Sequence, residues 1–345
     1  MTGPSASSPW QGRHGPLLIA EIGGNHEGDF DYAVRLTNLA IESGADFIKF
    51  QLYRGDTLVS PVESPDRAAH FKRFELRQDQ HRELATLCES AGVGYMASVW
   101  DLEMLEWIDS HLPIYKIGSG DLTAYPIVRE LAKRGKPIIL STGLATLDDV
   151  LDSVRFIQSV NPTYRSAQML ALLQCTSMYP IENQDANLRA MDTLREATGL
   201  TVGYSDHTTG TLALFVAASR GAQVLEFHFT DEREGKSFRD HKVSLTRDEV
   251  KHLCAELDEL DVLLGDGIKR PLACELESAH VTSFRRAVYC RRPLRAGEVI
   301  RQDDLVVLRP NHGIDARQFD AIAGKRAARD LKAFEAIEIQ QDDIK

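Results

Sequence analysis

The sequence lacks several features that would place it in a common class of protein. It has no apolar run approaching the roughly 20 residues of a membrane span. Its first stretch, Met1–Gly15, is rich in Ser, Pro and Gly and has no apolar core of the kind found in signal peptides. The sequence also has fewer basic than acidic residues, with 40 Lys and Arg against 51 Asp and Glu, and its formal net charge is −11. This balance argues against membrane and nucleic-acid partners, and any anionic ligand must be held by local positive charge.

Cysteine is scarce as well. The chain has five cysteines, and no two of them show CxxC spacing. An odd number of scattered thiols suits a reducing compartment, so we expect a cytoplasmic protein.

What the sequence does have is a regular alternation of β-rich and helix-like segments. Eight short apolar runs occur in the first part of the chain, each followed by a helix-like stretch. Eight β–α units in about 250 residues are typical of a closed TIM (β/α)8 barrel. An open doubly wound sheet shares the alternation, but no GxGxxG follows the first strand. The expected strands are Leu17–Glu21, Asp46–Gln51, Gly94–Ser98, Ile114–Ile117, Pro137–Ser141, Leu170–Cys175, Thr201–Ser205 and Val224–Phe229.

The segments between the strands predict helices, and one of them is unusually long. The stretch Asp56–Phe74 is a long βα connection, so we expect a lid or an extra helix there. The clearest amphipathic segments are Tyr32–Ser43, Gln80–Ala91, Tyr125–Arg134 and Leu147–Val160.

The pattern changes after Gly267, where short strands and turns replace the alternation. We therefore expect a disordered tail over residues 1–14, the barrel over 15–267, a linker over 268–282 and a separate small domain over 283–345. A domain of about 60 residues is marginally stable by itself, so it should pack on something larger.

Polar residues gather where the predicted strands end. Barrel enzymes place their chemistry at the C-terminal ends of the strands, and polar groups inside apolar strands are costly without a role. Period two puts Lys49 and Gln51 on one face of their strand and Phe50 on the other. The other strands end in Glu21, Ser98, Lys116 with Ser119 and Asp121, Ser141, Cys175, Ser205 with His207, and Glu226 with His228.

The cationic and hydroxyl groups among these residues predict an anion-binding site. Two lysines and several serines at neighbouring strand ends form a cradle of the kind that holds phosphate or carboxylate. A Schiff-base role for either lysine is the rival interpretation. The members of the cradle are Lys49, Lys116, Ser98, Ser119, Ser141 and Ser205.

His207 and His228 end neighbouring strands, so they can converge on one divalent ion. Imidazole suits several divalent metals, and two ligands leave positions open for substrate and water. Nearby carboxylates, on Glu21, Asp121 and Glu226, are candidates for a general base or for supporting the metal ligands.

At these residues the sequence resembles the sialic acid synthase family. The resemblance covers roughly residues 15–345, and its C-terminal part is similar to the family's antifreeze-like (SAF) domain. Its motifs are AEIGGNH at 20–26, KFQ at 49–51, YKIGSGD at 115–121, LSTG at 140–143, QCTSMYP at 174–180, GYSDHT at 203–208, LEFHFT at 225–230, the pair Asp240-His241, AGE at 296–298 and LRPNHG at 308–313.

The resemblance implies a condensation of phosphoenolpyruvate with the aldehyde of an amino sugar. C3 of the enol phosphate would attack the aldehyde, water would add at C2, and phosphate would leave by C–O cleavage. Lys49, Lys116 and the serines of the cradle would bind phosphoenolpyruvate. His207 and His228 would hold Mn²⁺ or Mg²⁺, and Asp121 would be the base, with Glu21 also at the catalytic centre.

The resemblance also implies how the sugar is bound. Gln51, Tyr179 and Asp240 would touch the sugar, and Arg309 would reach the N-acyl group from the small domain of a partner chain. The protein would then be a homodimer in which C-terminal domains are exchanged.

The sequence departs from the family pattern close to the predicted sugar site. Position 121 is Asp where many bacterial members have Glu, position 177 is Ser where Asn is common, and Phe238-Arg239 replaces the usual Gly-Pro. These changes leave the identity of the sugar open. The alternatives are a phosphoenolpyruvate aldol synthase of the Kdo-phosphate type, or a non-catalytic sugar-binding or ice-binding protein built on the antifreeze-like domain.

Overall fold

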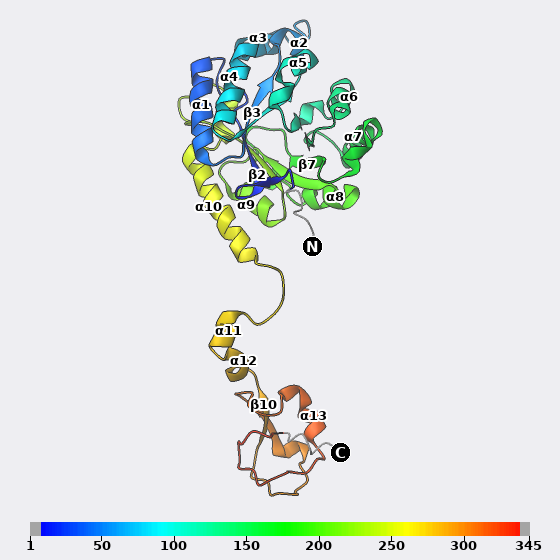
Figure 1. Cartoon of the computed structure of the whole chain (residues 1–345), viewed down its shortest axis with the longest axis vertical. Helices are drawn as coiled ribbons and strands as arrows, with labels where there is room; N and C mark the ends of the chain where they lie inside the picture. Colours follow the sequence, from blue (N-terminus) through cyan, green and yellow to red (C-terminus); the bar gives the residue numbers. More distant parts are fainter. Residues whose placement is uncertain (1–7, 339–345) are drawn as a thin grey trace. The chain divides into compact units, whose positions relative to one another are not determined.

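The computed structural model describes residues 8–338 of the chain and divides it into two compact units, with the boundary after Gly265 (Figure 1). Each unit has its own hydrophobic core. In residues 8–338, no helix combines the length and the apolar character that crossing a bilayer requires.

The first unit is a closed barrel of eight parallel strands, which confirms the predicted fold. Strands β2 to β9 pair in sequence order, and β2 also pairs with β9, so the sheet has no free edge. The strands are β2 (Gly15–Glu21), β3 (Phe47–Leu52), β4 (Gly94–Val99), β5 (Tyr115–Ile117), β6 (Ile138–Ser141), β7 (Leu170–Cys175), β8 (Thr201–Asp206) and β9 (Val224–His228).

Helices cover the outside of the barrel (Figure 1). Helix α1 ends at Gly44 and α6 at Gly135, both in the left-handed conformation that glycine adopts without steric cost. The long connection after β3 contains α2 and α3, as expected of an extra helix. The helices are α1 (Phe30–Ser43), α2 (Gly55–Leu58), α3 (Pro65–Phe74), α4 (Gln78–Ser90), α5 (Leu105–Ile108), α6 (Tyr125–Arg134), α7 (Leu147–Val160), α8 (Ala190–Thr198), α9 (Leu212–Ser219) and α10 (Arg247–Leu264).

The alternation of side chains along β3 is the one that the sequence predicts. Phe50 joins the outer core between strands and helices, where its ring stacks 5.7 Å from that of Tyr95. Lys49 therefore points to the inside of the barrel.

The expected tail over residues 1–14 is wrong for residues 8–14, and residues 1–7 lie outside the described part. Strand β1 (Gln11–Gly12) pairs antiparallel with the start of β2. Trp10 is 1% exposed, packs with Leu17 and Ile139 in the inner core of the barrel, and donates from Nε1 to Ala167 O at 2.7 Å. The Trp10 side chain thus anchors this segment to the barrel through its packing and its hydrogen bond.

The second unit has a small core around an antiparallel pair of strands, β10 (Ala287–Cys290) and β11 (Leu305–Leu308). Both strands lie in the part of the chain where the sequence predicts short strands and turns, and the short helix α13 (Phe319–Ile322) follows them. The segment expected to be a linker contains the short helices α11 (Ala273–Glu277) and α12 (His280–Ser283). Residues 339–345 of the predicted small domain lie outside the described residues.

Candidate active site

Four charged side chains form a network inside the barrel at the C-terminal ends of its strands. Lys49 Nζ lies 2.7 Å from Glu21 Oε2 and 3.1 Å from Glu226 Oε1. The other oxygen of Glu226 lies 3.4 Å from Lys116 Nζ. All four side chains are buried. Because a buried charge is costly unless it is paired, the two carboxylates make it possible to hold two lysines there.

The pKa values in this network show which carboxylate balances the lysines. Burial alone would lower the pKa of Lys49, but Glu21 and Glu226 outweigh burial and raise it. Burial lowers the pKa of Lys116 and raises that of Glu21. Burial also disfavours the ionised form of Glu226, yet Lys116 and Lys49 outweigh it and lower the pKa of that carboxyl. Glu226 is therefore the anion that the two lysines share.

The predicted serines lie beside the two lysines. Lys116 Nζ donates to Ser141 Oγ at 2.8 Å, and Lys49 Nζ lies 3.5 Å from Ser98 Oγ. Ser205 on β8 lies opposite Glu226 on β9 in the strand register. Ser119 Oγ accepts a hydrogen bond from the Gly143 backbone at 3.0 Å. The lysines and serines of the predicted cradle thus come together at one end of the barrel.

The two histidines lie side by side, with ring centroids 5.3 Å apart. His207 Nδ1 lies 2.7 Å from Thr176 O, so in the neutral ring Nδ1 is the donor and Nε2 keeps its lone pair. Burial disfavours the charged form of His207, but Cys175 and Thr176 outweigh burial and raise its pKa, so a metal ion at Nε2 would displace a proton. His228 Nδ1 is buried and has no hydrogen-bond partner within the described residues. Burial lowers the pKa of His228 and keeps the ring neutral, which a metal ligand requires.

These two imidazoles fit a divalent ion that keeps open coordination positions. No group of three or more His, Cys, Asp or Glu side chains in residues 8–338 could enclose a metal. An ion at His207 and His228 would therefore complete its coordination with water and substrate oxygens.

Three of the four predicted sugar-binding residues lie at this site. The ring of Tyr179 lies 4.0 Å from that of His207, and the buried Asp240 places Oδ2 3.9 Å from His228 Nδ1. Gln51 Nε2 donates to Glu21 Oε1 at 3.1 Å. Arg309 belongs to the second unit, where its guanidinium carbon lies 5.8 Å from the ring centroid of Phe284.

Asp121 follows β5 in a short 3-10 turn, Ser119–Asp121, and is partly buried. Burial raises the pKa of its carboxyl, and the charge of Lys116 opposes that rise. A carboxylate with a raised pKa is a stronger base than an exposed one, so its environment suits proton transfer.

Two neighbours of the predicted residues had no assigned role in the sequence. Cys175 Sγ lies 3.9 Å from His207 Nδ1, and Arg239 donates from Nε to Asp240 Oδ1 at 3.1 Å. The position of Cys175 at the end of β7 could have indicated its contact with His207. For the contact of Arg239 with Asp240, only the departure from the family pattern at Phe238-Arg239 gave an indication.

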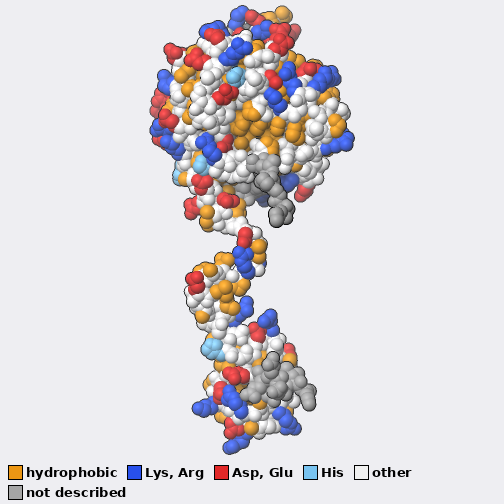
Figure 2. Space-filling model, viewed as in Figure 1, with side chains coloured by type: hydrophobic (Ala, Val, Ile, Leu, Met, Phe, Trp, Pro, Cys, Tyr) orange, Lys and Arg blue, Asp and Glu red, His pale blue; other side chains and the backbone are white. Residues whose placement is uncertain are grey.

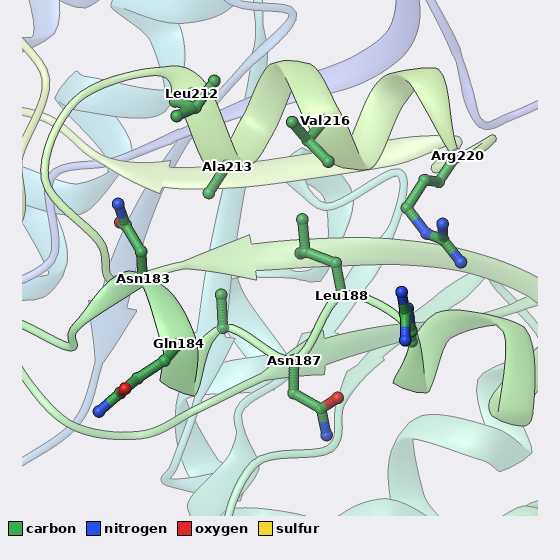
Figure 3. A pocket seen from close by; sticks show the side chains of 10 residues that line it. Asn183, Gln184, Asn187, Leu188, Leu212, Ala213, Val216 and Arg220 are labelled. Carbon is green, nitrogen blue, oxygen red and sulfur yellow. The ribbon is translucent and has the colours of Figure 1, made fainter.

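A groove on the outside of the barrel is separate from this site. It lies between the segment before α8 and the helix α9, and no predicted site residue lines it (Figure 3). Leu212, Ala213 and Val216 face it from α9, and Leu212 is 65% exposed. Arg220, at its end, is paired with Asp192. The groove is mainly apolar, and none of its lining residues is a candidate catalytic group.

Comparison with known proteins identifies the family. The family model named NeuB matches residues 36–269, and the model of the SAF domain matches residues 285–338. The chain belongs to the NeuB family. It is 34% identical over 334 residues to N,N'-diacetyllegionaminic acid synthase of Campylobacter jejuni, which covers 93% of this chain and 98% of the relative.

Other NeuB-family relatives are named synthases as well. Human N-acetylneuraminate-9-phosphate synthase is 32% identical over 309 residues, covering 86% of this chain and 84% of the human protein. Among solved structures, the N-acetylneuraminic acid synthetase of Leptospira borgpetersenii superposes with a TM-score of 0.69 at 29% identity, covering 76% of this chain and 90% of that one. This NeuB-family chain is therefore an enzyme related to sugar acid synthases, with a TIM barrel followed by a SAF domain.

Proposed function

We propose that this enzyme condenses phosphoenolpyruvate with the open-chain aldehyde of an N-acyl amino sugar and water, and releases a nine-carbon 2-keto-3-deoxy acid and phosphate. The observation that carries the proposal is the buried network in which Lys49 and Lys116 share Glu226 beside the two histidines. The relatives named as sialic, legionaminic and pseudaminic acid synthases support the same reaction class.

Phosphoenolpyruvate would bind at the two lysines and the serines next to them. Its phosphate and carboxylate need charge-assisted donors in a site from which water is excluded, and Lys49 and Lys116 are buried there. Glu226 already offsets part of the charge of the two lysines, so an arriving anion also needs neutral donors. The hydroxyls of Ser98, Ser119, Ser141 and Ser205 are neutral donors at this end of the barrel.

The aldehyde would lie beside the histidines. His207 and His228 would hold Mn²⁺ or Mg²⁺, which when bound supplies polarisation of the aldehyde oxygen. Asp121 would take a proton from the water that adds at C2. Tyr179, Asp240 and Gln51 would orient the sugar above phosphoenolpyruvate, and C–O cleavage would then release phosphate.

The active form would be a homodimer with exchanged C-terminal domains, in which Arg309 contacts the sugar's N-acyl group in the partner's barrel. Large apolar side chains recur on both sides of the unit boundary in the sequence, and they support an interface with a partner chain (Figure 2). These residues are Val262, Leu263, Leu264, Ile268, Leu272 and Leu276.

The test is a phosphate-release assay with phosphoenolpyruvate, Mn²⁺ and a panel of aldehyde sugars. The proposal predicts release that depends on both the sugar and phosphoenolpyruvate, with equal formation of the keto acid. Turnover restricted to a phosphorylated pentose would favour an enzyme of the Kdo-phosphate type. Binding of sugars without any consumption of phosphoenolpyruvate would favour a binding protein and contradict the proposal.

A further inference from the structure

Arg239 borders the predicted sugar site. Arg67 and Arg73 lie on α3, which packs against Phe238 beside it, and we refer to Arg67, Arg73 and Arg239 as the basic rim. Arg67 and Arg73 lie three residues before and three residues after His70 on α3, so each is a neighbour of His70 on the surface of that helix. Arg239 begins the 3-10 helix Arg239–Val243, which carries Asp240. All three side chains are exposed.

An aromatic cluster joins the two elements that carry the basic rim. The rings of His70 and Phe238 stack with centroids 5.6 Å apart, and Phe74 lies 5.1 Å from Phe238 and 4.3 Å from His70. Helix α3 therefore packs directly against the residue that precedes Arg239.

Two glycines after β2 allow this close packing. A Cβ at Gly24 would lie 2.9 Å from Cε1 of Phe238. A Cβ at Gly28, where φ is +83°, would lie 2.2 Å from the carbonyl oxygen of Arg73. The backbone around residues 24–28 thus fixes the positions of Phe238 and of the end of α3.

Arg239 of the basic rim lies at the outer end of a line of residues that starts in the barrel. The buried histidine pair comes first, and the ring of Tyr179 lies 4.0 Å from that of His207. The guanidinium carbon of Arg239 then lies 4.6 Å from the centroid of Tyr179, and 67% of the Arg239 side chain is exposed. A sugar with its aldehyde at the histidines would direct its other end toward Arg239.

Positive charge on the basic rim is only partly matched. Arg239 uses Nε for Asp240, and no ion pair engages Arg67 or Arg73 within residues 8–338. Burial lowers the pKa of His70, and the charges of Arg73, Arg239 and Arg67 lower it further.

We propose that the basic rim binds an anionic group, a phosphate monoester or a carboxylate, on the acceptor sugar at the end remote from its aldehyde. The planar guanidinium offers paired donors that match the oxygens of both groups. This inference rests on the proposed function, because it takes the aldehyde to lie beside His207 and His228. It narrows the acceptor to an acidic N-acyl amino sugar.

The test compares three acceptors that share one six-carbon chain and differ only at C6: N-acetylmannosamine, its 6-phosphate and the corresponding 6-carboxylate. The kcat/KM of each acceptor is measured with the full chain, with Arg239→Gln and with Arg67→Gln/Arg73→Gln. Arg129→Gln is the matched control, since Arg129 lies on α6, where its guanidinium stacks on Phe156. Binding of each acceptor is also measured by calorimetry.

The inference predicts that the unaltered enzyme prefers one acidic acceptor and that each rim variant lowers the acidic-to-neutral ratio about tenfold. The preference should weaken with added salt, because the rim is exposed and its charges are screened. The relative values for phosphate and carboxylate identify the group. Equal kcat/KM for the neutral and both acidic sugars, with an acidic-to-neutral ratio that the rim variants do not change, overturns the inference and leaves the proposed reaction intact. If none of the three acceptors is turned over, equal affinity of the unaltered enzyme and the rim variants for the acidic sugars in calorimetry overturns the inference, and the panel of aldehyde sugars tests the proposed reaction separately.

Discussion

Glu226 Oε1 lies 3.1 Å from Lys49 Nζ in the interior of the barrel, and the other oxygen of the same carboxylate faces a second buried lysine. Removing this charge should leave Lys116 without its carboxylate partner. We expect Glu226→Gln to destabilise the protein by about 3–5 kcal/mol, the usual cost of breaking a buried ion pair. The measurement is chemical and thermal unfolding of the full chain.

The control for this change is Glu130→Gln on the outer face of α6, where Glu130 pairs with Lys133 in solvent. An exposed pair contributes less than about 1 kcal/mol, so this variant should unfold almost like the unaltered protein. Equal effects of the two substitutions would mean that Glu226 does not hold the buried lysines in place.

Replacing either buried lysine should weaken the use of phosphoenolpyruvate. Lys49→Met and Lys116→Met should each cost about 2–4 kcal/mol in kcat/KM for this substrate, because a desolvated charge-assisted contact is lost. Lys133→Met, an exposed change on α6, should have no such effect. Borohydride trapping of a covalent adduct on Lys49 or Lys116 would instead support a Schiff-base aldolase.

The histidine pair should be required for metal binding as well as for turnover. We expect His207→Ala/His228→Ala to abolish Mn²⁺ binding measured by calorimetry or by electron paramagnetic resonance. His252→Ala, on the exposed side of α10, should bind Mn²⁺ normally. Chelation should stop turnover, and Mn²⁺ or Mg²⁺ should restore it. Full activity of the double variant would rule out this pair as the metal ligands.

A methyl group at Gly24 should displace Phe238 and disturb acceptor binding. Because the added Cβ would lie 2.9 Å from the Phe238 ring, we expect Gly24→Ala to raise KM for the acceptor more than KM for phosphoenolpyruvate. Combining it with Phe238→Leu removes the clash and should recover part of the loss. A lack of recovery would place the effect of Gly24→Ala elsewhere.

Exchange of C-terminal domains makes a prediction for mixed dimers. Arg309→Ala and Asp121→Asn should each reduce turnover strongly. In a heterodimer of the two variants, one of the two barrels keeps Asp121 and receives Arg309 from its partner. Heterodimers make up about half of a random equal mixture, so about a quarter of all sites should recover. Unfolding and refolding the mixture together provides the heterodimers. No recovery, or a monomer in solution, would contradict the exchange.

The sequence predicts the barrel well because each strand is a local pattern. Runs such as Leu170–Cys175 and Thr201–Asp206 are apolar, short and followed by a helix, and the structure places them within a residue of the expected bounds. The positions of the strand-end residues follow, since parallel strands in a barrel bring their C-terminal ends together.

What the sequence does not predict are contacts between segments far apart in the chain. The contact of Phe238 with His70 joins residues separated by well over a hundred positions, and no local pattern records it. The burial of Trp10 was missed because a Ser- and Pro-rich composition resembles a disordered tail. The sharing of Glu226 by two lysines depends on barrel geometry and not on spacing along the chain.

The most direct test of the proposed reaction follows the bridging oxygen of phosphoenolpyruvate. The enzyme is incubated with Mn²⁺, the best acceptor from the sugar panel, and phosphoenolpyruvate carrying ¹⁸O between C2 and phosphorus. C–O cleavage predicts that the label leaves with the phosphate and that the new keto oxygen comes from water, both of which mass spectrometry measures. Retention of ¹⁸O in the keto acid, which requires P–O cleavage, would contradict the account.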